Sequence, residues 1–228
     1  MSGTVERAGR IRFRDRTEAG RTLARALAGY AGRNDVVVLA LPRGGVPVAY
    51  EVAKELGAPL DVFVVRKLGV PGHEELAMGA IASGGVLVLD EGILRRLGIG
   101  QAEIERSVAL ELRELERREA AYRGHRPPPD LKGKTAILVD DGLATGATMR
   151  AAARAVRRFD PARVVVAVPV ASRQTCDEFR NDVDEIVCAI TPEPFYSVGL
   201  WYEDFSQTTD DEVRDLLARA SQQADGQP

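Results

Sequence analysis

Short apolar runs rich in β-branched residues alternate with longer helical patterns along most of the chain. The run Val36–Leu41 is apolar at every position, which is typical of a central strand in a parallel sheet because other elements cover both of its faces. Helical patterns follow at residues 46–56, 148–158 and 172–179. Further apolar runs, which predict strands, lie at residues 62–66, 135–139, 163–168 and 183–189. Strands and helices in this order predict an α/β fold with a mostly parallel sheet flanked by helices.

The middle of the chain interrupts this alternation. Residues 78–82 and 86–89 lie on either side of a Ser-Gly-Gly turn and predict a β-hairpin. A heavily charged helix is expected at residues 101–122, either on the surface or against a second subunit, and we expect a homodimer. A proline-rich linker at 126–130 separates this helix from the next predicted strand.

Both ends of the chain carry signals for the start of a helix. Asp15 with Glu18, and Thr209 with Glu212, have the three-residue spacing of a capping box. We therefore expect a helix directly after Asp15 and a C-terminal helix that begins near Asp210.

Composition and charge exclude several classes of protein. The chain has 228 residues, is 45% hydrophobic and 29% charged, and carries a net charge of -3. These values are typical of a globular protein and give too little positive charge for a dedicated nucleic-acid binder. No stretch of 18 consecutive apolar residues is present, so we expect neither a membrane span nor a membrane partner.

The N-terminal sequence bears on the location of the protein, and the number of cysteines and histidines bears on disulfides and zinc. The first residues lack the apolar stretch of a secretory signal, so we expect a cytoplasmic protein. Cys176 and Cys188 are too few to form a disulfide framework, and His73 and His125 are the only histidines, so no structural zinc site is expected.

A basic run lies near the N-terminus. Residues 6–25 contain seven arginines against three acids. A run this short and this mixed in sign makes a poor electrostatic footprint for nucleic acid. We interpret it as a solvated face.

The loop after the strand predicted at 135–139 combines two adjacent carboxylates with a run of small residues. Asp140 and Asp141 stand at the strand tip, where ligands bind in folds of this kind. The small residues and threonines at 144–148 let backbone N–H groups and hydroxyls approach an anion at the start of a helix. Such a loop suits a phosphorylated sugar, because it can take the phosphate while the acids take hydroxyls or a metal ion.

A plainer interpretation is that the two acids cap the helix predicted at 148–158 and that the glycine-containing stretch is an ordinary turn. Two adjacent acids after an apolar run, followed by Thr-Gly-x-Thr, argue against it.

The segment Val139–Thr148 resembles the phosphoribosyl diphosphate (PRPP) binding motif of type I phosphoribosyltransferases. Other parts of that family occur in the same order, so the resemblance spans about residues 10–206. It implies that Asp140 and Asp141 hold the ribose hydroxyls, directly or through Mg²⁺. It also implies that the loop binds the 5-phosphate through Ala144, Thr145, Gly146, Ala147 and Thr148.

A second segment resembles the short pyrophosphate-binding loop of the family. Residues 41–45 (Leu-Pro-Arg-Gly-Gly) directly follow the first predicted strand. The resemblance implies that Arg43 supplies a cation, while Gly44 and Gly45 free the backbone for unusual torsions. A tight turn with a solvated arginine is the alternative interpretation.

A third segment lies at the end of the next predicted strand. Arg66 and Lys67 resemble a pair that meets the diphosphate in adenine and orotate phosphoribosyltransferases. Residues 68–75 resemble the mobile loop that covers the reacting sugar in the family. His73 lies in this stretch, and its role is left open.

A fourth segment is rich in aromatic residues. Aromatics form only 5% of the chain, yet residues 195–205 contain five of them. The resemblance implies a small hood that recognises the base, formed by Phe195, Tyr196, Trp201 and Tyr202. A hydrophobic cover for the C-terminal helix is the alternative. We expect a core at 10–190, a hood segment at 191–206, and a C-terminal helix and tail at 207–228.

The resemblance implies transfer of the 5-phosphoribosyl group from PRPP to a nitrogenous base with release of pyrophosphate and with Mg²⁺ as cofactor. Arg66 and Lys67 would stabilise the leaving diphosphate, and the acidic pair would stabilise the positive ribose. In the 6-oxopurine enzymes of the family, an acid stands four places after the first acid of the pair. Ala144 occupies that place here, which disfavours hypoxanthine and guanine, and the acceptor base stays open.

A second hypothesis is a regulator with the same fold that senses PRPP or a nucleotide without catalysis and contacts nucleic acid through the basic N-terminal run. Arg66, Lys67 and the stretch at 68–75 favour an enzyme, because a sensor has less need of them. Other nucleotide motifs fail. Gly133-Lys134-Thr135 lacks the earlier glycine of a P-loop, and no Gly-x-Gly-x-x-Gly pattern follows the first strand.

Overall fold

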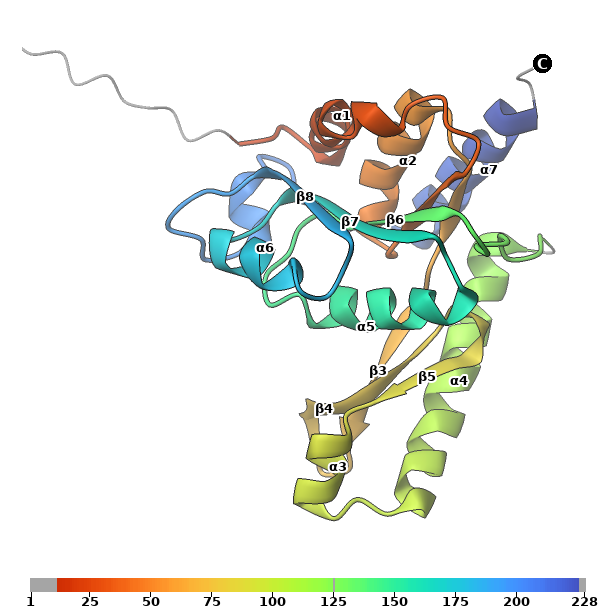
Figure 1. Cartoon of the computed structure of the whole chain (residues 1–228), viewed down its shortest axis with the longest axis vertical. Coiled ribbons are helices and arrows are strands. Elements are labelled where there is room, and N and C mark those ends of the chain that lie inside the picture. The colour runs from red at the N-terminus through yellow and green to blue at the C-terminus, as the bar shows by residue number, and fades with distance from the viewer. Residues whose placement is uncertain (1–11, 125, 226–228) are drawn as a thin grey trace, which may run out of the picture.

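The computed structural model describes residues 12–124 and 126–225, and its centre is a five-stranded parallel sheet (Figure 1). The strand order is β2-β1-β6-β7-β8. These strands are β1 (Val36–Ala40), β2 (Leu60–Val62), β6 (Thr135–Val139), β7 (Arg163–Val170) and β8 (Glu185–Ile190). All four neighbouring pairs are parallel, which confirms the predicted fold class.

Helices cover both faces of this sheet, and every position of β1 and β6 is buried. Alternate residues of β1 and β6 face opposite layers: Val38 and Ile137 belong to one core, and Leu39 and Leu138 to the other. The first layer is formed by α1 (Arg16–Ala26), α2 (Gly45–Leu56) and α7 (Asp210–Asp225). The second is formed by α5 (Ala147–Val156) and α6 (Arg173–Phe179). Short 3-10 helices are η1 (Ala28–Tyr30), η2 (Ser83–Gly85), η3 (Arg157–Phe159) and η4 (Val198–Trp201).

The middle of the chain forms an arm that projects from the core (Figure 1). It comprises residues 65–123: β3 (Val65–Val70), β4 (His73–Ala82), β5 (Val86–Leu89), α3 (Glu91–Leu97) and α4 (Gln101–Arg123). The three strands form an antiparallel sheet in the order β3-β4-β5. The predicted hairpin and the predicted long helix are both confirmed.

One expectation about the arm is wrong. The stretch at 68–75 is not a loop but the end of β3, a short turn and the start of β4. Antiparallel pairing of Leu68 with Gly79 and of Val70 with His73 extends the hairpin through this stretch. A glycine with φ of 76° at position 72 allows the chain to reverse there.

A buried ion pair anchors the arm to the core. Arg123, the last residue of α4, places Nε 3.0 Å from Oδ2 of Asp61 in the edge strand β2. Its Nη2 also donates to the carbonyl oxygen of Val62 at 3.0 Å. Burial raises the pKa of Asp61, and the charge of Arg123 opposes that rise. Removal of either partner would leave the other charge buried and unpaired, which is costly in free energy. These contacts therefore hold the base of the arm against the core.

The ends of the chain match their predicted signals. Glu18 N donates to Oδ1 of Asp15 at 2.8 Å where α1 begins. Thr209 N donates to the Glu212 carboxylate, and Glu212 N donates to Thr209 Oγ1, which is a complete capping box. Residues 6–11 of the basic run, which include Arg7 and Arg10, lie outside the described residues. His125 lies outside them as well.

Two further features concern cysteine and membrane contact. Cys176 of α6 and Cys188 of β8 are joined in a disulfide, a pairing that no sequence pattern predicted. Among the described residues, no helix combines the length and the apolar character needed to cross a bilayer.

Candidate active site

The predicted acidic pair lies at the edge of the sheet where the loops after β1 and β6 meet. These two strands are parallel neighbours, so their carboxyl ends reach the same edge. A Cβ atom added at Gly44 would lie only 2.1 Å from Oδ2 of Asp141, and one added at Gly45 would lie 2.7 Å from the carbonyl oxygen of Val139. The loop at 41–45 can therefore rest on the acidic pair only because both positions lack a side chain.

Each acid of the pair uses one oxygen within the protein. Asp141 N donates to Oδ1 of Asp140 at 2.8 Å. Arg16 places Nε and Nη2 each 2.9 Å from Oδ2 of Asp141. Within residues 12–124 and 126–225, no hydrogen bond reaches Oδ2 of Asp140 or Oδ1 of Asp141. Two carboxylate oxygens are thus available to a ligand.

The environment of the pair disfavours two full charges. Burial raises the pKa of Asp140, and the charge of Asp141 raises it further. Burial also raises the pKa of Asp141, but the Arg16 guanidinium opposes that rise. A bound cation or hydroxyl donors would favour the charged forms.

The loop from Ala144 to Thr148 has the form expected of an anion site. Two of its carbonyl groups are occupied by donors of the protein: the carbonyl of Ala144 accepts from Thr175 Oγ1 at 3.0 Å, and that of Thr145 accepts from Arg150 Nη1 at 2.9 Å. The first-turn N–H groups of α5 have no partner within the helix, and the side chain of Thr148 is exposed.

Gly146 sets the shape of this loop. Its φ of 72° is left-handed, and a Cβ atom there would lie 2.4 Å from the Phe179 ring. Glycine therefore satisfies both the torsion and the close packing at the point where α5 begins.

Arg66 and Lys67 leave opposite faces of β3, as adjacent residues in a strand must. Arg66 faces α4, where its Nη2 lies 2.6 Å from Oε2 of Glu111. Lys67 is half-exposed, and its Nζ lies 3.9 Å from a Glu75 oxygen. Lys67 and Thr148 line the same cavity of about 330 Å³ between the arm and α5. The structure therefore brings Lys67, and not Arg66, toward the phosphate loop.

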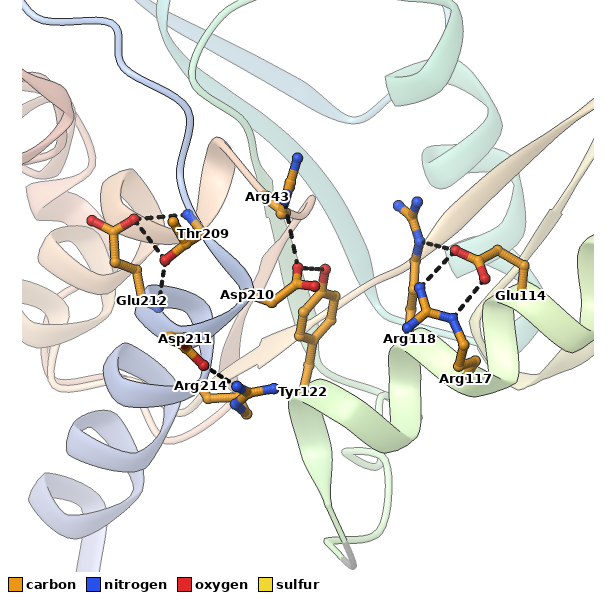
Figure 2. A network of polar contacts seen from close by, with 10 residues as sticks. All are labelled: Arg43, Glu114, Arg117, Arg118, Tyr122, Thr209, Asp210, Asp211, Glu212 and Arg214. Carbon is orange, nitrogen blue, oxygen red and sulfur yellow. Dashed lines mark hydrogen bonds and ion pairs between the residues drawn. The ribbon is translucent and has the colours of Figure 1, made fainter.

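Arg43 of the loop at 41–45 belongs to a polar network with the C-terminal helix (Figure 2). Its Nη1 lies 3.8 Å from Oδ1 of Asp210, the first residue of α7. Tyr122 of α4 donates to the same oxygen at 2.7 Å. Burial and the Asp210 hydrogen bond raise the pKa of Tyr122 to about 12. One carboxylate thus connects the predicted pyrophosphate loop to both α4 and α7.

The aromatic residues of the predicted hood fall into two groups. Trp201 and Tyr202 are 5% and 3% exposed, and their cluster includes Phe13. Tyr202 Oη donates to the carbonyl oxygen of Asp141 at 2.6 Å. Phe195 is partly buried and Tyr196 is 75% exposed. Only the second group has ring surface that a base could contact.

Arg16 is a functional candidate that sequence patterns did not reveal. The interpretation of the basic run as a solvated face is wrong for this residue, because its side chain is 11% exposed and paired with Asp141. Arg16 and Asp141 are 125 positions apart in the sequence. No pattern in the sequence signals a contact of that range.

His73 lies at the start of β4 on the outer end of the arm and is exposed. The structure places it at the turn of the hairpin, where it pairs with Val70.

A divalent cation is compatible with the residues present. No group of three or more His, Cys, Asp or Glu side chains with metal-binding geometry occurs in the described part of the chain. Mg²⁺ commonly binds one or two protein carboxylates and takes its other ligands from phosphates and water. The two available oxygens of Asp140 and Asp141 fit that requirement.

Known proteins share both the sequence and the fold. A Mycobacterium tuberculosis protein (strain ATCC 25618 / H37Rv) named "Putative phosphoribosyl transferase Rv0571c" is 49% identical over 208 residues, which cover 91% of this chain and 47% of that protein. This chain therefore spans about half the length of that relative. The "Bifunctional protein PyrR" of Chloroflexus aurantiacus is 38% identical over 136 residues, which cover 55% of this chain and 65% of that protein.

The structural comparison agrees over nearly the whole chain. The crystal structure of TT1426 from Thermus thermophilus is similar with a TM-score of 0.82 and 47% sequence identity, covering 91% of this chain and 98% of that one. The family model described as "Phosphoribosyl transferase domain" matches residues 14–200. That match contains the acidic pair, the phosphate loop and the loop at 41–45, so the chain belongs to the phosphoribosyl transferase domain family.

Proposed function

We propose that this protein transfers the 5-phosphoribosyl group of PRPP to a ring nitrogen of a base and releases pyrophosphate. One juxtaposition carries the proposal. Two available carboxylate oxygens, the glycine loop at 41–45 and the outward N–H groups at the start of α5 meet at one edge of the sheet. Ribose hydroxyls, a diphosphate and a 5-phosphate are the groups that these three features suit.

In this reaction the base nitrogen forms a bond to C1 of the ribose as the bond from C1 to the diphosphate oxygen breaks. The electron pair of the broken bond leaves with pyrophosphate, and the N–H proton of the base passes to the departing pyrophosphate or to solvent. Positive charge grows on the ribose, which the acidic pair stabilises. Negative charge grows on the diphosphate, for which Lys67, Arg43 and the loop amides are the candidate cations and donors.

Mg²⁺ fits the acidic pair and would neutralise charge on the diphosphate when bound. The residues that would hold it are Asp140 and Asp141, through the oxygens that the protein leaves free. Arg16 keeps Asp141 oriented whether or not a cation is present, because it binds the other oxygen.

The exposed aromatic residues indicate where the acceptor base would bind. Tyr196 and Phe195 present accessible ring surface, whereas Tyr202 supports the acidic pair from the core and Trp201 is buried in the same cluster as Tyr202. Since Ala144 cannot accept a proton, a base that needs an acid at that position is disfavoured. We propose a nitrogenous base other than hypoxanthine or guanine.

A second candidate is a regulator that binds PRPP or a nucleotide without turning it over. The placement of Arg66 favours it, because this predicted diphosphate ligand is paired with Glu111 on the far face of β3. A binding protein has less need of a cation at the leaving group than an enzyme has.

Binding and turnover separate the two candidates. Isothermal titration calorimetry with PRPP and Mg²⁺, and separately with nucleoside monophosphates, should show saturable binding of PRPP by the transferase and of at least one of these ligands by the regulator. Pyrophosphate release measured across a panel of purine, pyrimidine and other nitrogenous bases should then show turnover with at least one base. Binding without release for every base would favour the regulator. The absence of PRPP binding would overturn the transferase, and the absence of binding of every ligand would overturn both candidates.

A further inference from the structure

Arg16 contacts two parts of the molecule that are far apart in the sequence. Its Nε and Nη2 bind Oδ2 of Asp141, each at 2.9 Å. Its Nη1 donates to the carbonyl oxygen of Ser206 at 2.7 Å, and its guanidinium carbon lies 4.1 Å from the centre of the Phe205 ring. The side chains of Arg16 and Asp141 are both largely buried.

Residues 201–206 form a segment that lies along the N-terminal part of the chain. Phe13 N donates to the carbonyl oxygen of Trp201 at 2.9 Å, and Glu203 N donates to that of Phe13 at 2.8 Å. Tyr202 Oη donates to the carbonyl oxygen of Asp141 at 2.6 Å. The segment is therefore held both by backbone pairing and by side chains at the acidic pair.

We propose that Arg16 is a positioning residue that couples Asp141 to residues 201–206, so that a ribose ligand on Asp141 also orders the segment beside the acceptor aromatics. The ligand half of this inference rests on the proposed function. The structural half, that Arg16 holds the segment against Asp141, stands on the contacts alone.

The simultaneous contacts with Asp141, Ser206 and the Phe205 ring require a guanidinium group. Its donors lie in one rigid plane, so three of them can reach two acceptors on different segments while the face packs on a ring. A lysine has a single charged nitrogen and cannot bind Asp141 and Ser206 with that geometry. Arg16 leaves Oδ1 of Asp141 available, so a ligand and Arg16 can bind the same carboxylate together.

Hydrogen exchange of the ligand-free protein tests the structural half. Amides of residues 201–206 should exchange about tenfold faster in Arg16→Gln, because local opening is less opposed. Arg16→Lys should restore only part of the protection. The matched control is Arg14→Gln, since Arg14 lies two residues earlier and its side chain is 70% exposed and, among the described residues, pairs only with Glu18. The substitution keeps the backbone carbonyl of Arg14, which accepts from Asp204 N. Exchange that is unchanged in Arg16→Gln, or equally fast in the control, would overturn the coupling.

A double-mutant cycle shows whether Arg16 acts through Asp141. Affinity for PRPP with Mg²⁺ should fall about tenfold in Arg16→Gln and at least as much in Asp141→Asn, and the double variant should lose less than the product of the two. Losses that multiply would mean that the residues act independently and would overturn the inference.

Ligand-induced protection completes the test. PRPP with Mg²⁺ should slow exchange at 144–148 in both wild type and Arg16→Gln, but should slow exchange at 201–206 only in wild type. Equal protection of 201–206 in both proteins would overturn the coupling. If wild type binds no PRPP, the proposed function and the ligand half of the inference fail, while exchange of the ligand-free variants still decides whether Arg16 holds the segment.

Discussion

The acids at the tip of β6 and the cations of β3 are held in opposite ways. Asp141 is largely buried and is contacted from three separate segments: Arg16 from α1, Tyr202 near the C-terminus and Gly44 from the loop after β1. Lys67 is half-exposed on the projecting arm, with one carboxylate 3.9 Å away. Asp141 is thus held in place before a ligand arrives, whereas Lys67 is held loosely.

This difference assigns different tasks to the two regions. Preorganised groups stabilise developing charge without rearrangement, which suits the role that we propose for the acids at the ribose. A long side chain on a hairpin can move to meet a ligand, which suits the role that we propose for Lys67 at the diphosphate. Substitutions in the two regions should therefore differ in size, with the greatest losses at the acids and the least on the surface of the arm.

Removal of both charges from the acidic pair should have the greatest consequence. Asp140→Asn combined with Asp141→Asn should lower turnover at least a hundredfold, about 3 kcal/mol in the activation barrier, because the positive ribose loses its stabilisation. Turnover is measured as pyrophosphate release with the best base of the panel, and circular dichroism checks the fold. Undiminished turnover in a folded double variant would refute the ribose assignment.

A methyl group at Gly44 should disturb the same region through packing. Because its Cβ would lie 2.1 Å from Asp141 Oδ2, Gly44→Ala must displace either the loop or the carboxylate. We expect a loss of about 1–3 kcal/mol in the free energy of unfolding, together with weaker PRPP binding. Gly29→Ala is the matched control, since a Cβ atom there meets nothing within 4 Å. Equal stability of the two variants in urea melts would contradict the packing argument.

The two cations of β3 should differ from each other. Lys67→Ala should weaken PRPP binding about tenfold, the contribution of one hydrogen bond to a charged group, and should weaken binding of a nucleoside monophosphate less because that ligand has no diphosphate. Arg66→Ala should have the smaller effect on PRPP, since Arg66 faces Glu111. Calorimetry on both variants with PRPP and with the nucleoside monophosphate measures these affinities. Equal losses of affinity for the two ligands in Lys67→Ala would contradict a role of Lys67 at the diphosphate.

A surface acid on the arm should matter least. Hydrogen bonds from Arg117 and Arg118 lower the pKa of Glu114 to about 2 from its usual 4.5. A lowered folded-state pKa means that the ionised acid stabilises the fold above about pH 4.5 and loses this contribution as the pH falls toward 2. Glu114→Gln should therefore lower Tm by only about 1 °C near neutral pH, and less as the pH is lowered. A difference in Tm that grows on acidification would contradict this sign.

Local patterns accounted for most of the fold and for the first parts of the site. The apolar strands, the starts of α1 and α7, the hairpin and the long helix were predictable because each depends on residues close together in the sequence. The family resemblance at Val139–Thr148 agrees with the family match over residues 14–200. The homodimer, the cytoplasmic location and the Mg²⁺ cofactor stay predictions.

One feature of the site had a signal that could have been used. Strand alternation alone separates Arg66 from Lys67, because adjacent residues in a strand point to opposite faces. The extension of the hairpin through residues 73–77 had no such signal, because His-Glu-Glu-Leu-Ala does not alternate between polar and apolar residues. Trp201 and Tyr202 had no such signal, because a ring that stacks on a ligand and a ring in the core look alike in a sequence.

Residue type and short-range periodicity were enough to establish which strands are central, where helices begin and which loop carries two acids beside a turn of small residues. The contacts of Arg16 with Asp141 and of Asp210 with Arg43 emerged only from the packed chain. The physical reason is separation along the chain. A contact between residues 125 positions apart depends on how the layers pack, and packing energy is shared among many residues that no local pattern reveals.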